Sequence, residues 1–213
     1  MTRILVADDH KLFREGLKQI LGEHKDLLVA GEASNGQEVV DEVWKRDFDL
    51  VLLDISMPGM SGLDVLKHLK AQKPRLRVLV LSMYPEEQYA VRAIRAGAAG
   101  YLTKASAADE LIQAIRKICS GGRYISVSIA EKLLFDLNPD TGKLPHEKLS
   151  DREYQILCMI ASGKTVSRIA EELNLSVKTV STYRVRILEK MGMGSNAELT
   201  NYAIKQNLIC LTD

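Results

Sequence analysis

Cysteine is scarce in this sequence of 213 residues, and the positions of the cysteines argue against a zinc site and against a disulfide framework. Cys119, Cys158 and Cys210 are far apart, and no pair has the spacing of a zinc site or a disulfide framework. Long apolar runs are also missing. No segment approaches the ~18 apolar residues of a membrane helix, and residues 4–7 form a run too short for a signal peptide. We therefore expect a cytoplasmic protein with no membrane segment.

Net charge is nearly absent as well. The chain has 29 Lys and Arg against 28 Asp and Glu, a balance of +1 at pH 7. The chain as a whole therefore lacks the excess of positive charge that is typical of proteins that bind nucleic-acid phosphates. Apolar residues at 46% and charged residues at 27% indicate a globular chain rather than an extensively disordered one. The length fits one or two domains of roughly 100–200 residues each.

The first 125 residues alternate short apolar runs with amphipathic stretches. Strands are predicted at residues 3–7, 28–31, 50–53, 78–81 and 100–102. Helices are predicted at residues 12–21, 37–46, 62–69, 85–96 and 107–119. In the second of these helices, Val39, Val40, Val43 and Trp44 share one side. Apolar strands alternating with helices indicate a parallel sheet covered on both faces, so we expect an α/β fold with five strands in a doubly wound sheet.

The pattern changes after Gly121–Gly122. One more helix is predicted over residues 127–137, and Pro, Asn and Gly residues then mark an exposed linker. From Leu149 onward the chain has only helical segments, four in number, the first with a capping box formed by Ser150 and Glu153. We expect three parts: a domain over 1–125, a helical or flexible linker over 126–148, and an all-α four-helix domain over 149–213.

Polar residues follow the predicted strands at the points where the strands end. In chain order they are Asp8 and Asp9, Asp54, Ser82 and Lys104. Because parallel strands share one carboxyl edge, three carboxylates, a hydroxyl and an ammonium converge there. Crowded carboxylates need a cation, and sparse oxygen ligands suit Mg²⁺.

Asp54, on the central strand, is placed to act as an oxygen nucleophile, as in aspartyl-phosphate chemistry. The Ser82 hydroxyl and the Lys104 ammonium can neutralise the oxygens of a transferring phosphoryl group. Solubilising acids at strand ends would explain any one of these residues but not the set. The residues therefore predict phosphoryl transfer to Asp54.

Residues 1–125 resemble the receiver domain of two-component response regulators, which has a flavodoxin-like fold. The resemblance lies in Asp8–Asp9, Asp54 followed by Met57-Pro58-Gly59, Ser82, and Tyr101 with Lys104. It implies that a sensor histidine kinase phosphorylates Asp54. It also implies that Mg²⁺ is held by Asp8, Asp9, Asp54 and the backbone carbonyl of Ser56.

The resemblance further implies that Ser82 and Tyr101 form a switch pair and that Lys104 contacts the phosphate. Ala105 stands where many receivers have a proline in a cis bond. A cis bond before a non-proline residue costs about 2.5–4 kcal/mol, so the geometry of the Lys104–Ala105 peptide is left open.

Phosphatases similar to haloacid dehalogenases are the enzymatic alternative, because they also pair a strand-end Asp nucleophile with Mg²⁺. They need a second Asp two residues after the nucleophile, as the general acid, and that position is Ser56 here. A site without this acid forms an acyl phosphate and hydrolyses it slowly. We therefore expect the chain not to be an enzyme.

Residues 166–192 have the spacing of a helix-turn-helix, with a turn at Asn174–Leu175 and a longer helix that Ser176 caps and Gly192 ends. The buried residues expected there are Ile169, Ala170, Leu173, Val177, Val180, Ile187, Leu188 and Met191. Hydroxyl and cationic side chains remain on the outward face, which suits entry into a major groove. Between Ser176 and Gly192 the sequence has four basic residues and one acidic residue, Glu189. This helix is therefore locally basic within a neutral chain.

Residues 149–208 resemble the C-terminal DNA-binding domain of LuxR-type regulators, and a receiver before this domain is the NarL/FixJ architecture. The segment from Thr179 to Lys190 is similar to the global-activator branch of that family. The candidate DNA-binding residues are Lys178, Thr179, Ser181, Thr182, Arg184, Arg186 and Lys190. Tyr183 replaces the His common in the family and is assigned no base contact. Residues 196–206 are expected to pair two subunits on DNA, to close the core through Leu199, Tyr202 and Ala203, or both.

The expected protein is a response regulator in which phosphorylation of Asp54 controls dimerisation and sequence-specific DNA binding to regulate transcription. The expected partners are a sensor histidine kinase, double-stranded promoter DNA with a symmetric site, and a second copy of the chain, with RNA polymerase as a further candidate. An adaptor that acts by protein–protein contacts is the alternative.

Overall fold

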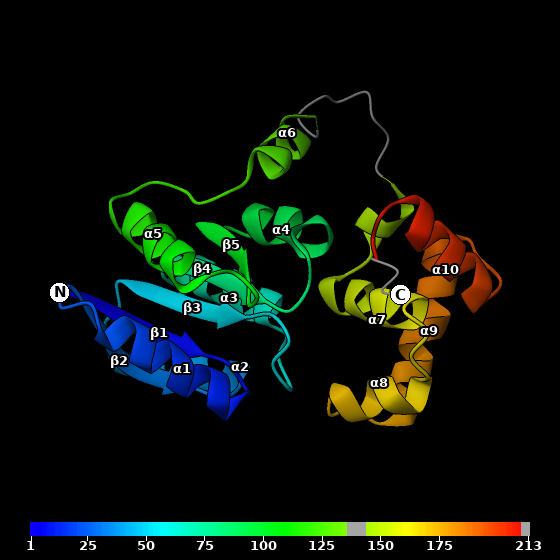
Figure 1. The fold of residues 1–213 in the computed structure, drawn as a ribbon. Helices are drawn as coiled ribbons and strands as arrows, with labels where there is room; N and C mark the ends of the chain where they lie inside the picture. Colours follow the sequence, from blue (N-terminus) through cyan, green and yellow to red (C-terminus); the bar gives the residue numbers. More distant parts are fainter. Residues whose placement is uncertain (136–143, 210–213) are drawn as a thin grey trace. The chain divides into compact units, whose positions relative to one another are not determined.

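The computed structural model describes residues 1–135 and 144–209, which divide into two compact units, Met1–Leu133 and Leu134–Asp213 (Figure 1). Residues 136–143 of the predicted linker and Cys210 lie outside the described residues. Within them, no helix is long and apolar enough to cross a membrane.

The first unit alternates strands and helices along the chain (Figure 1). Its strands are β1 (Thr2–Ala7), β2 (Leu27–Ala33), β3 (Leu50–Asp54), β4 (Arg77–Ser82) and β5 (Gly100–Thr103). Its helices are α1 (Lys11–Gly22), α2 (Gly36–Lys45), α3 (Gly62–Gln72), α4 (Glu86–Arg95) and α5 (Ala108–Cys119), and α6 (Val127–Phe135) crosses the boundary between the units. Neighbouring strands are parallel in the order β2-β1-β3-β4-β5, which confirms the predicted doubly wound sheet.

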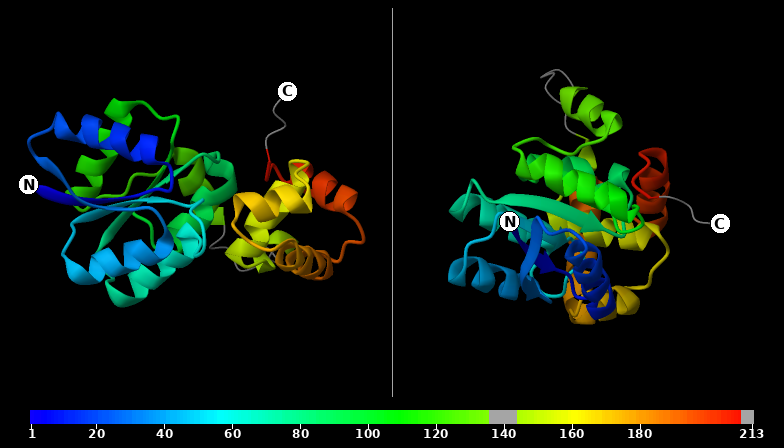
Figure 2. Two further views of the ribbon diagram at one scale, coloured as in Figure 1. Left: turned by 90° about the horizontal axis from the view of Figure 1, so that it is seen from below. Right: turned by 60° about the vertical axis from the view of Figure 1, so that its left-hand side comes forward.

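Helices cover both faces of this sheet. In Figure 2 (left), α1 and α5 lie on one side of the strands, and α2 and α3 lie on the other. The core on the α1 and α5 side joins strand residues such as Ile4 and Leu52 to Leu17 and Ile115, all under 5% exposed. Each such side chain stabilises the fold by about 1.5–3 kcal/mol when buried. This burial explains why apolar runs predicted the strands to within about two residues.

Trp44 lies outside the buried face of α2, so its predicted place beside Val39 and Val43 is wrong. Val39 and Val43 are buried, whereas Trp44 is 62% exposed. Trp44 stands one residue beyond Val43, which turns its side chain about 100° around the helix axis. Periodicity predicts which residues share a face of the helix. The neighbouring elements decide how much of the helix surface on either side of that face is buried.

The second unit is helical. It contains a 3₁₀ turn, η1 (Pro145–Lys148), and α7 (Asp151–Ala161), α8 (Val166–Glu172), α9 (Val177–Met191) and α10 (Asn196–Lys205). The predicted capping box at the start of α7 is confirmed, with Ser150 Oγ accepting from Glu153 N and Glu153 accepting from Ser150 N. Ser176 caps α9, and Gly192 ends it in the left-handed conformation at φ 65°.

The small core of the second unit is centred on α7, which contacts α8, α9 and α10. Ile169, Val180, Ile187 and Leu199 are all fully buried there. Val177 was expected in this set but is 51% exposed, because the first turn of α9 projects beyond the core. The α8–α9 turn is tight, with Leu175 N donating to Ala170 O at 2.8 Å. The predicted helix-turn-helix is therefore present.

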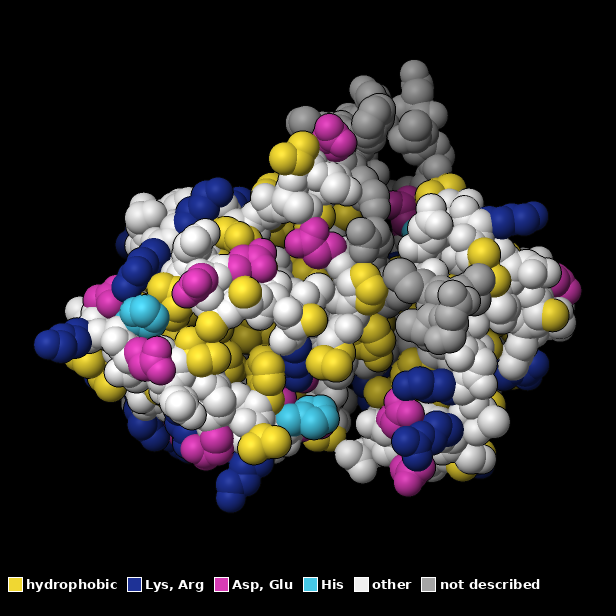
Figure 3. All heavy atoms as spheres, viewed as in Figure 1, with side chains coloured by type: hydrophobic (Ala, Val, Ile, Leu, Met, Phe, Trp, Pro, Cys, Tyr) yellow, Lys and Arg dark blue, Asp and Glu magenta, His cyan; other side chains and the backbone are white. Residues whose placement is uncertain are grey.

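Acidic and basic side chains are interspersed on the visible face of each unit (Figure 3). This mixing agrees with the near-zero net charge of the chain. A local excess of one sign must therefore be sought on single elements such as α9.

Candidate functional site

Asp8 and Asp54 meet at the carboxyl edge of the sheet because β1 and β3 are neighbours. Asp54 ends β3 and Asp8 directly follows β1, and both are almost completely buried. Lys104, which follows β5, places its Nζ 2.6 Å from Asp8 Oδ2 and 2.7 Å from Asp54 Oδ2. One ammonium group therefore bridges two buried acids, and the structure brings together three residues that sequence reasoning placed at this edge.

Burial and oppositely charged neighbours act in opposite directions on the pKa values of Asp54 and Lys104. Burial raises the pKa of Asp54 above its ordinary value, and nearby Asp8 adds to this effect although Lys104 opposes it. Burial alone would lower the pKa of Lys104, but the two carboxylates hold that pKa above its ordinary value. Lys104 is therefore charged at neutral pH, and a further cation would favour ionisation of Asp54.

Asp9 and His10 add two more ligand-type atoms to this edge. One such atom from each of Asp8, Asp9, His10 and Asp54 lies within 4.8 Å of the others. Asp9 Oδ1 is buried and accepts no hydrogen bond from the residues that the structure describes. Three carboxylates form the oxygen-rich set that Mg²⁺ prefers. The residues present therefore fit a divalent cation.

The loop after β3 is packed tightly against Asp54. Ser56 N donates to Asp54 Oδ1 at 3.0 Å, and Gly62 N donates to Ile55 O at 3.0 Å. A Cβ atom at Gly62 would overlap the Asp54 carbonyl oxygen and lie 2.6 Å from Ile55 Cα. Only glycine fits at this position without a backbone shift. The packing fixes the backbone of Ser56, whose carbonyl is the fourth ligand expected from the sequence.

Ser82 and Tyr101 are both fully buried next to this site, and both bond to the backbone of Tyr84. Tyr84 N donates to Ser82 Oγ at 3.0 Å, and the Tyr101 hydroxyl donates to Tyr84 O at 2.8 Å. Burial raises the pKa of Tyr101 well above its ordinary value, so the phenol stays neutral and remains a donor. The Lys104–Ala105 peptide, left open by the sequence, is trans.

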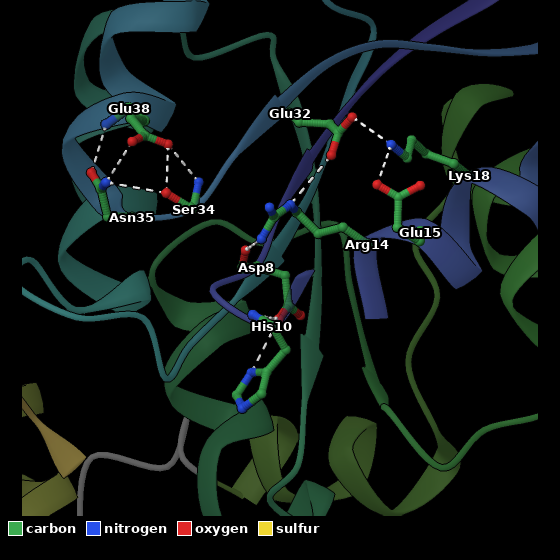
Figure 4. A network of polar contacts seen from close by, with 9 residues as sticks. All are labelled: Asp8, His10, Arg14, Glu15, Lys18, Glu32, Ser34, Asn35 and Glu38. Atoms are coloured by element: carbon green, nitrogen blue, oxygen red, sulfur yellow. Dashed lines mark hydrogen bonds and ion pairs between the residues drawn. The ribbon is translucent and has the colours of Figure 1, made fainter. Parts of the chain in front are cut away.

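A polar network on α1 and β2 anchors the backbone beside the acids (Figure 4). Arg14 Nη1 donates to the backbone oxygen of Asp8 at 2.7 Å, and Arg14 Nε lies 3.3 Å from Glu32 Oε2. Lys18 Nζ then joins Glu32 at 2.8 Å to Glu15 at 2.7 Å. This chain of contacts ties α1 to the loop that carries Asp8, and so fixes where its carboxylate points.

The outward face of α9 carries a shallow hollow of about 320 Å³. It is lined by Lys178, Thr179, Thr182, Tyr183 and Arg186. Lys178 and Arg186 are exposed and form no ion pair with the residues that the structure describes. Ser181 is exposed on the same helix. Two cations and several hydroxyl groups on one exposed helix face can contact phosphates and base edges.

Other candidates on α9 are engaged within the unit. Arg184 Nε donates to Asn196 Oδ1 at 2.6 Å, and Lys190 Nζ lies 2.6 and 2.8 Å from the two oxygens of Glu153. Burial would raise the pKa of Glu153, but the bonds from Lys190 and Ser150 hold it below its ordinary value. These two cations therefore link α9 to α10 and α7, which the count of charges in the sequence did not reveal.

Two residues that lie at these sites, His10 and Val185, were not among the site residues predicted from the sequence. His10 lies beside the acidic cluster, and its adjacency to Asp8 and Asp9 was the available signal. Val185 is 50% exposed on α9, where helical periodicity alone already turned it outward. An exposed methyl-bearing side chain among hydroxyl and cationic groups can contact a thymine methyl group.

Two protein families match this chain in the same order as its two units. The response regulator receiver domain family matches residues 4–116, and the luxR family of bacterial regulatory proteins matches residues 147–203. These ranges contain the buried acidic site and the helix-turn-helix, respectively.

Relatives match over nearly the whole length. The response regulator UvrY of Escherichia coli strain K12 is 39% identical over 98% of this chain and 96% of its own. The response regulator GacA of Pseudomonas protegens is 39% identical over 98% of each chain.

Solved structures show the same architecture. RcsB of Salmonella enterica serovar Typhimurium, bound to promoter rprA with phosphomimetic BeF₃⁻, has a TM-score of 0.64 and is 26% identical, over 95% of this chain and 98% of that one. A LuxR family two-component response regulator from Aurantimonas has a TM-score of 0.59 at 32% identity, over 64% of this chain and 97% of that one. The chain belongs to the response regulators that join a receiver domain to a LuxR-type DNA-binding domain and regulate transcription.

Proposed function

We propose that Asp54 is the phosphoacceptor and that a sensor histidine kinase is the donor. The observation that carries this proposal is the bridge from Lys104 to the buried carboxylates of Asp8 and Asp54. Such an arrangement presents one oxygen nucleophile beside a fixed cation, which is what a transferring phosphoryl group requires.

We propose that Asp8, Asp9, Asp54 and the carbonyl of Ser56 hold Mg²⁺. When bound, the cation neutralises the oxygens of the phosphoryl group and the repulsion among the acids. The Asp54 oxygen attacks phosphorus, and the bond to the kinase's phosphohistidine nitrogen breaks, with the electron pair remaining on the imidazole. Ser56 stands two residues after Asp54, so the chain supplies no second Asp as a general acid. This supports a regulator rather than a phosphatase.

The new phosphoryl oxygens compete for the groups that surround Asp54. Lys104 is already within 2.7 Å of Asp54 and needs only a small movement to contact them. Ser82 Oγ accepts from Tyr84 N, and its own hydroxyl proton remains able to donate to a phosphoryl oxygen. Tyr101 shares Tyr84 as its partner, so a change at Ser82 is transmitted to the Tyr101 ring through that segment. This is a local electrostatic change acting on a bistable element.

The output is binding of two copies of α9 to double-stranded promoter DNA. We assign base and phosphate contacts to Lys178, Thr179, Ser181, Thr182 and Arg186, with Arg184 and Lys190 at the edge of the surface. The local charge of α9 is small, so two copies bind DNA far better than one. Related RcsB structures, one of which contains two dimers on two parallel DNAs, support a dimer on a symmetric site. RNA polymerase is the further partner that a promoter-bound regulator meets.

The boundaries that fit this function are a receiver over 1–125, a linker over 126–148 and a DNA-binding domain over 149–213. The two compact units and the two family matches support a division in this region.

The test combines phosphorylation with DNA retention. The full chain and an Asp54→Asn variant are treated with acetyl phosphate and Mg²⁺, then mixed with fragments of total genomic DNA. We expect selective retention of some fragments by the phosphorylated wild type and little by the variant. An exposed α3 acid, Asp64, supplies the control variant Asp64→Asn. Phosphorylation without any retained fragment would favour the adaptor, and labelling of the Asp54→Asn variant would refute the assigned phosphosite.

A further inference from the structure

His10 lies directly against the carboxylates of the receiver site. It is the N-cap residue of α1, and its side chain is 66% exposed. Its Nδ1 atom is 2.7 Å from Asp9 Oδ1 and 3.3 Å from Asp8 Oδ1. The backbone nitrogen of His10 donates to Asp8 Oδ1 at 2.9 Å, which fixes the loop on which the ring sits (Figure 4).

The contact between the imidazole and Asp9 is an ion pair at 2.7 Å that lacks the geometry of a hydrogen bond. Asp9 Oδ1 is buried and accepts no hydrogen bond from the described residues, although Nδ1 is so close. In the tautomer that carries its proton on Nε2, Nδ1 is an acceptor and can share a bound ion with the Asp9 oxygen. Adjacent ligands of an octahedral ion at about 2.1 Å lie about 3.0 Å apart, and the separations from His10 to Asp9 and Asp8 bracket that value.

We propose that His10 contributes its imidazole nitrogen to the cation site, so that the site binds a divalent first-row transition ion more tightly than Mg²⁺. Mg²⁺ prefers oxygen ligands, whereas imidazole suits ions such as Co²⁺ and Ni²⁺. A site of carboxylates alone discriminates weakly among divalent ions. One nitrogen ligand changes this, because affinity for such a site rises from Mn²⁺ to Ni²⁺.

This inference rests on the proposed cation site at Asp8, Asp9 and Asp54. The other histidines offer no comparable arrangement. Within the described residues, no other place brings three or more His, Cys, Asp or Glu side chains together in this way. His146, in the second unit, is 2.8 Å from the Tyr202 hydroxyl. His24 and His68 belong to no such cluster, and His68 serves as the control.

The identity of the bound ion is then a second input to the receiver. An ion held through His10 occupies the place of Mg²⁺ beside Asp54. The phosphoacceptor is then prepared for phosphorylation with a different cation, and the exchange of one cation for the other depends on His10.

The experiment measures binding of Mg²⁺ and Ni²⁺ to the full, untagged chain by isothermal titration calorimetry at one fixed neutral pH. Four proteins are compared: the wild type, His10→Gln, the control His68→Gln, and Asp9→Asn. Mn²⁺ is then bound to the wild type and to His10→Gln, and pulsed electron paramagnetic resonance detects any directly bound ¹⁴N nucleus.

We expect Ni²⁺ to bind the wild type more tightly than Mg²⁺ and to lose on the order of 10-fold or more in His10→Gln. Mg²⁺ affinity stays within about threefold, His68→Gln behaves as the wild type, and the ¹⁴N coupling vanishes in His10→Gln. Equal losses for both ions, or no ¹⁴N coupling in the wild type, would overturn the proposal. Tighter binding of both ions by His10→Gln would show that the imidazole competes with cations, and would also overturn it. Failure of the cation site itself is distinct, because then Asp9→Asn would bind both ions as well as the wild type does.

Discussion

Lys104 Nζ lies 2.7 Å from Asp54 Oδ2, across 50 residues of sequence. The same nitrogen lies 2.6 Å from Asp8 Oδ2, so a single cation balances two acids from different strands. This relationship explains how the site exists before any phosphoryl group arrives. The ammonium holds the acids at the sheet edge and remains in place to meet the phosphoryl oxygens. Because Lys104 pairs with two buried acids, we expect it to contribute to the stability of the receiver as well as to its function.

Lys104→Met should destabilise the receiver, because it leaves two buried carboxylates without their cation. Removing one partner of a buried pair costs about 3–5 kcal/mol, and the expected loss in unfolding free energy is at the lower end because Asp8 also accepts a hydrogen bond from His10 N. Urea denaturation measures the loss. Added Mg²⁺ should restore part of it in Lys104→Met, since it supplies a cation to the same acids. The exposed residue Lys25 gives the control variant Lys25→Met, and equal stability of the two variants would contradict the bridging role.

Tyr101→Phe tests the contact that ties β5 to the segment after β4. The Tyr101 hydroxyl donates to Tyr84 O at 2.8 Å in a fully buried position, and its loss should cost about 1 kcal/mol of unfolding free energy. Tyr183→Phe on α9 is the control and should be close to neutral. If thermal denaturation showed no difference between the two variants, the contact with Tyr84 would not be holding the phenol inward.

The sheet and the acidic edge could be predicted from the sequence because both follow from local rules. Buried apolar runs set the strands, and parallel topology then placed Asp8, Asp54 and Lys104 together. The exposure of Trp44 could not be predicted in this way, because it depends on which element covers the last turn of α2. Periodicity likewise put Val177 inside a core that the first turn of α9 does not reach.

Side-chain partners were harder to predict than positions. The basic residues of α9 looked equivalent in the sequence, yet Arg184 bonds to Asn196 and Lys190 pairs with Glu153. These contacts depend on the packing of α9 against α10 and α7, which composition does not encode. The same holds for Gly62, which is required only because its α carbon approaches the backbone of Asp54.

Lys190→Ala should destabilise the second unit in a way that depends on pH. The folded pKa of Glu153 is below its ordinary value because of bonds from Lys190 and Ser150 that outweigh burial. The ionised carboxylate therefore contributes stability that is fully present above the unfolded pKa of about 4.3 and is lost as pH falls through the lower folded pKa. We expect Lys190→Ala to cost about 1 kcal/mol at neutral pH, since Lys190 is 44% exposed and solvent screens the pair.

Urea denaturation of wild type and Lys190→Ala across the acidic range measures this difference. The gap between the two curves should close as the pH falls and Glu153 becomes protonated. A gap that persisted unchanged at the lowest pH would mean that Lys190 stabilises the unit by packing rather than through the carboxylate.

The double variant Lys178→Ala with Arg186→Ala separates DNA-contacting cations from structural ones. Both side chains are exposed on α9, line its hollow and have no ion-pair partner among the described residues, so their charges are available to phosphates. Each lost phosphate contact should reduce the slope of log affinity against log salt by about 0.9, or about 1.8 per subunit for the pair. Fluorescence anisotropy with a retained genomic fragment, measured over a range of salt concentrations, gives the slope.

The matched control is Arg184→Ala with Lys190→Ala, which removes the same charge from the same helix. Because those cations are engaged by Asn196 and Glu153, the control should weaken folding more and change the salt slope less. Binding is therefore compared at a temperature where both variants remain folded, checked by circular dichroism. A larger change of slope in the control than in Lys178→Ala with Arg186→Ala would place the phosphates along the other edge of α9, and would reverse the assignment of contacts made from the exposed surface.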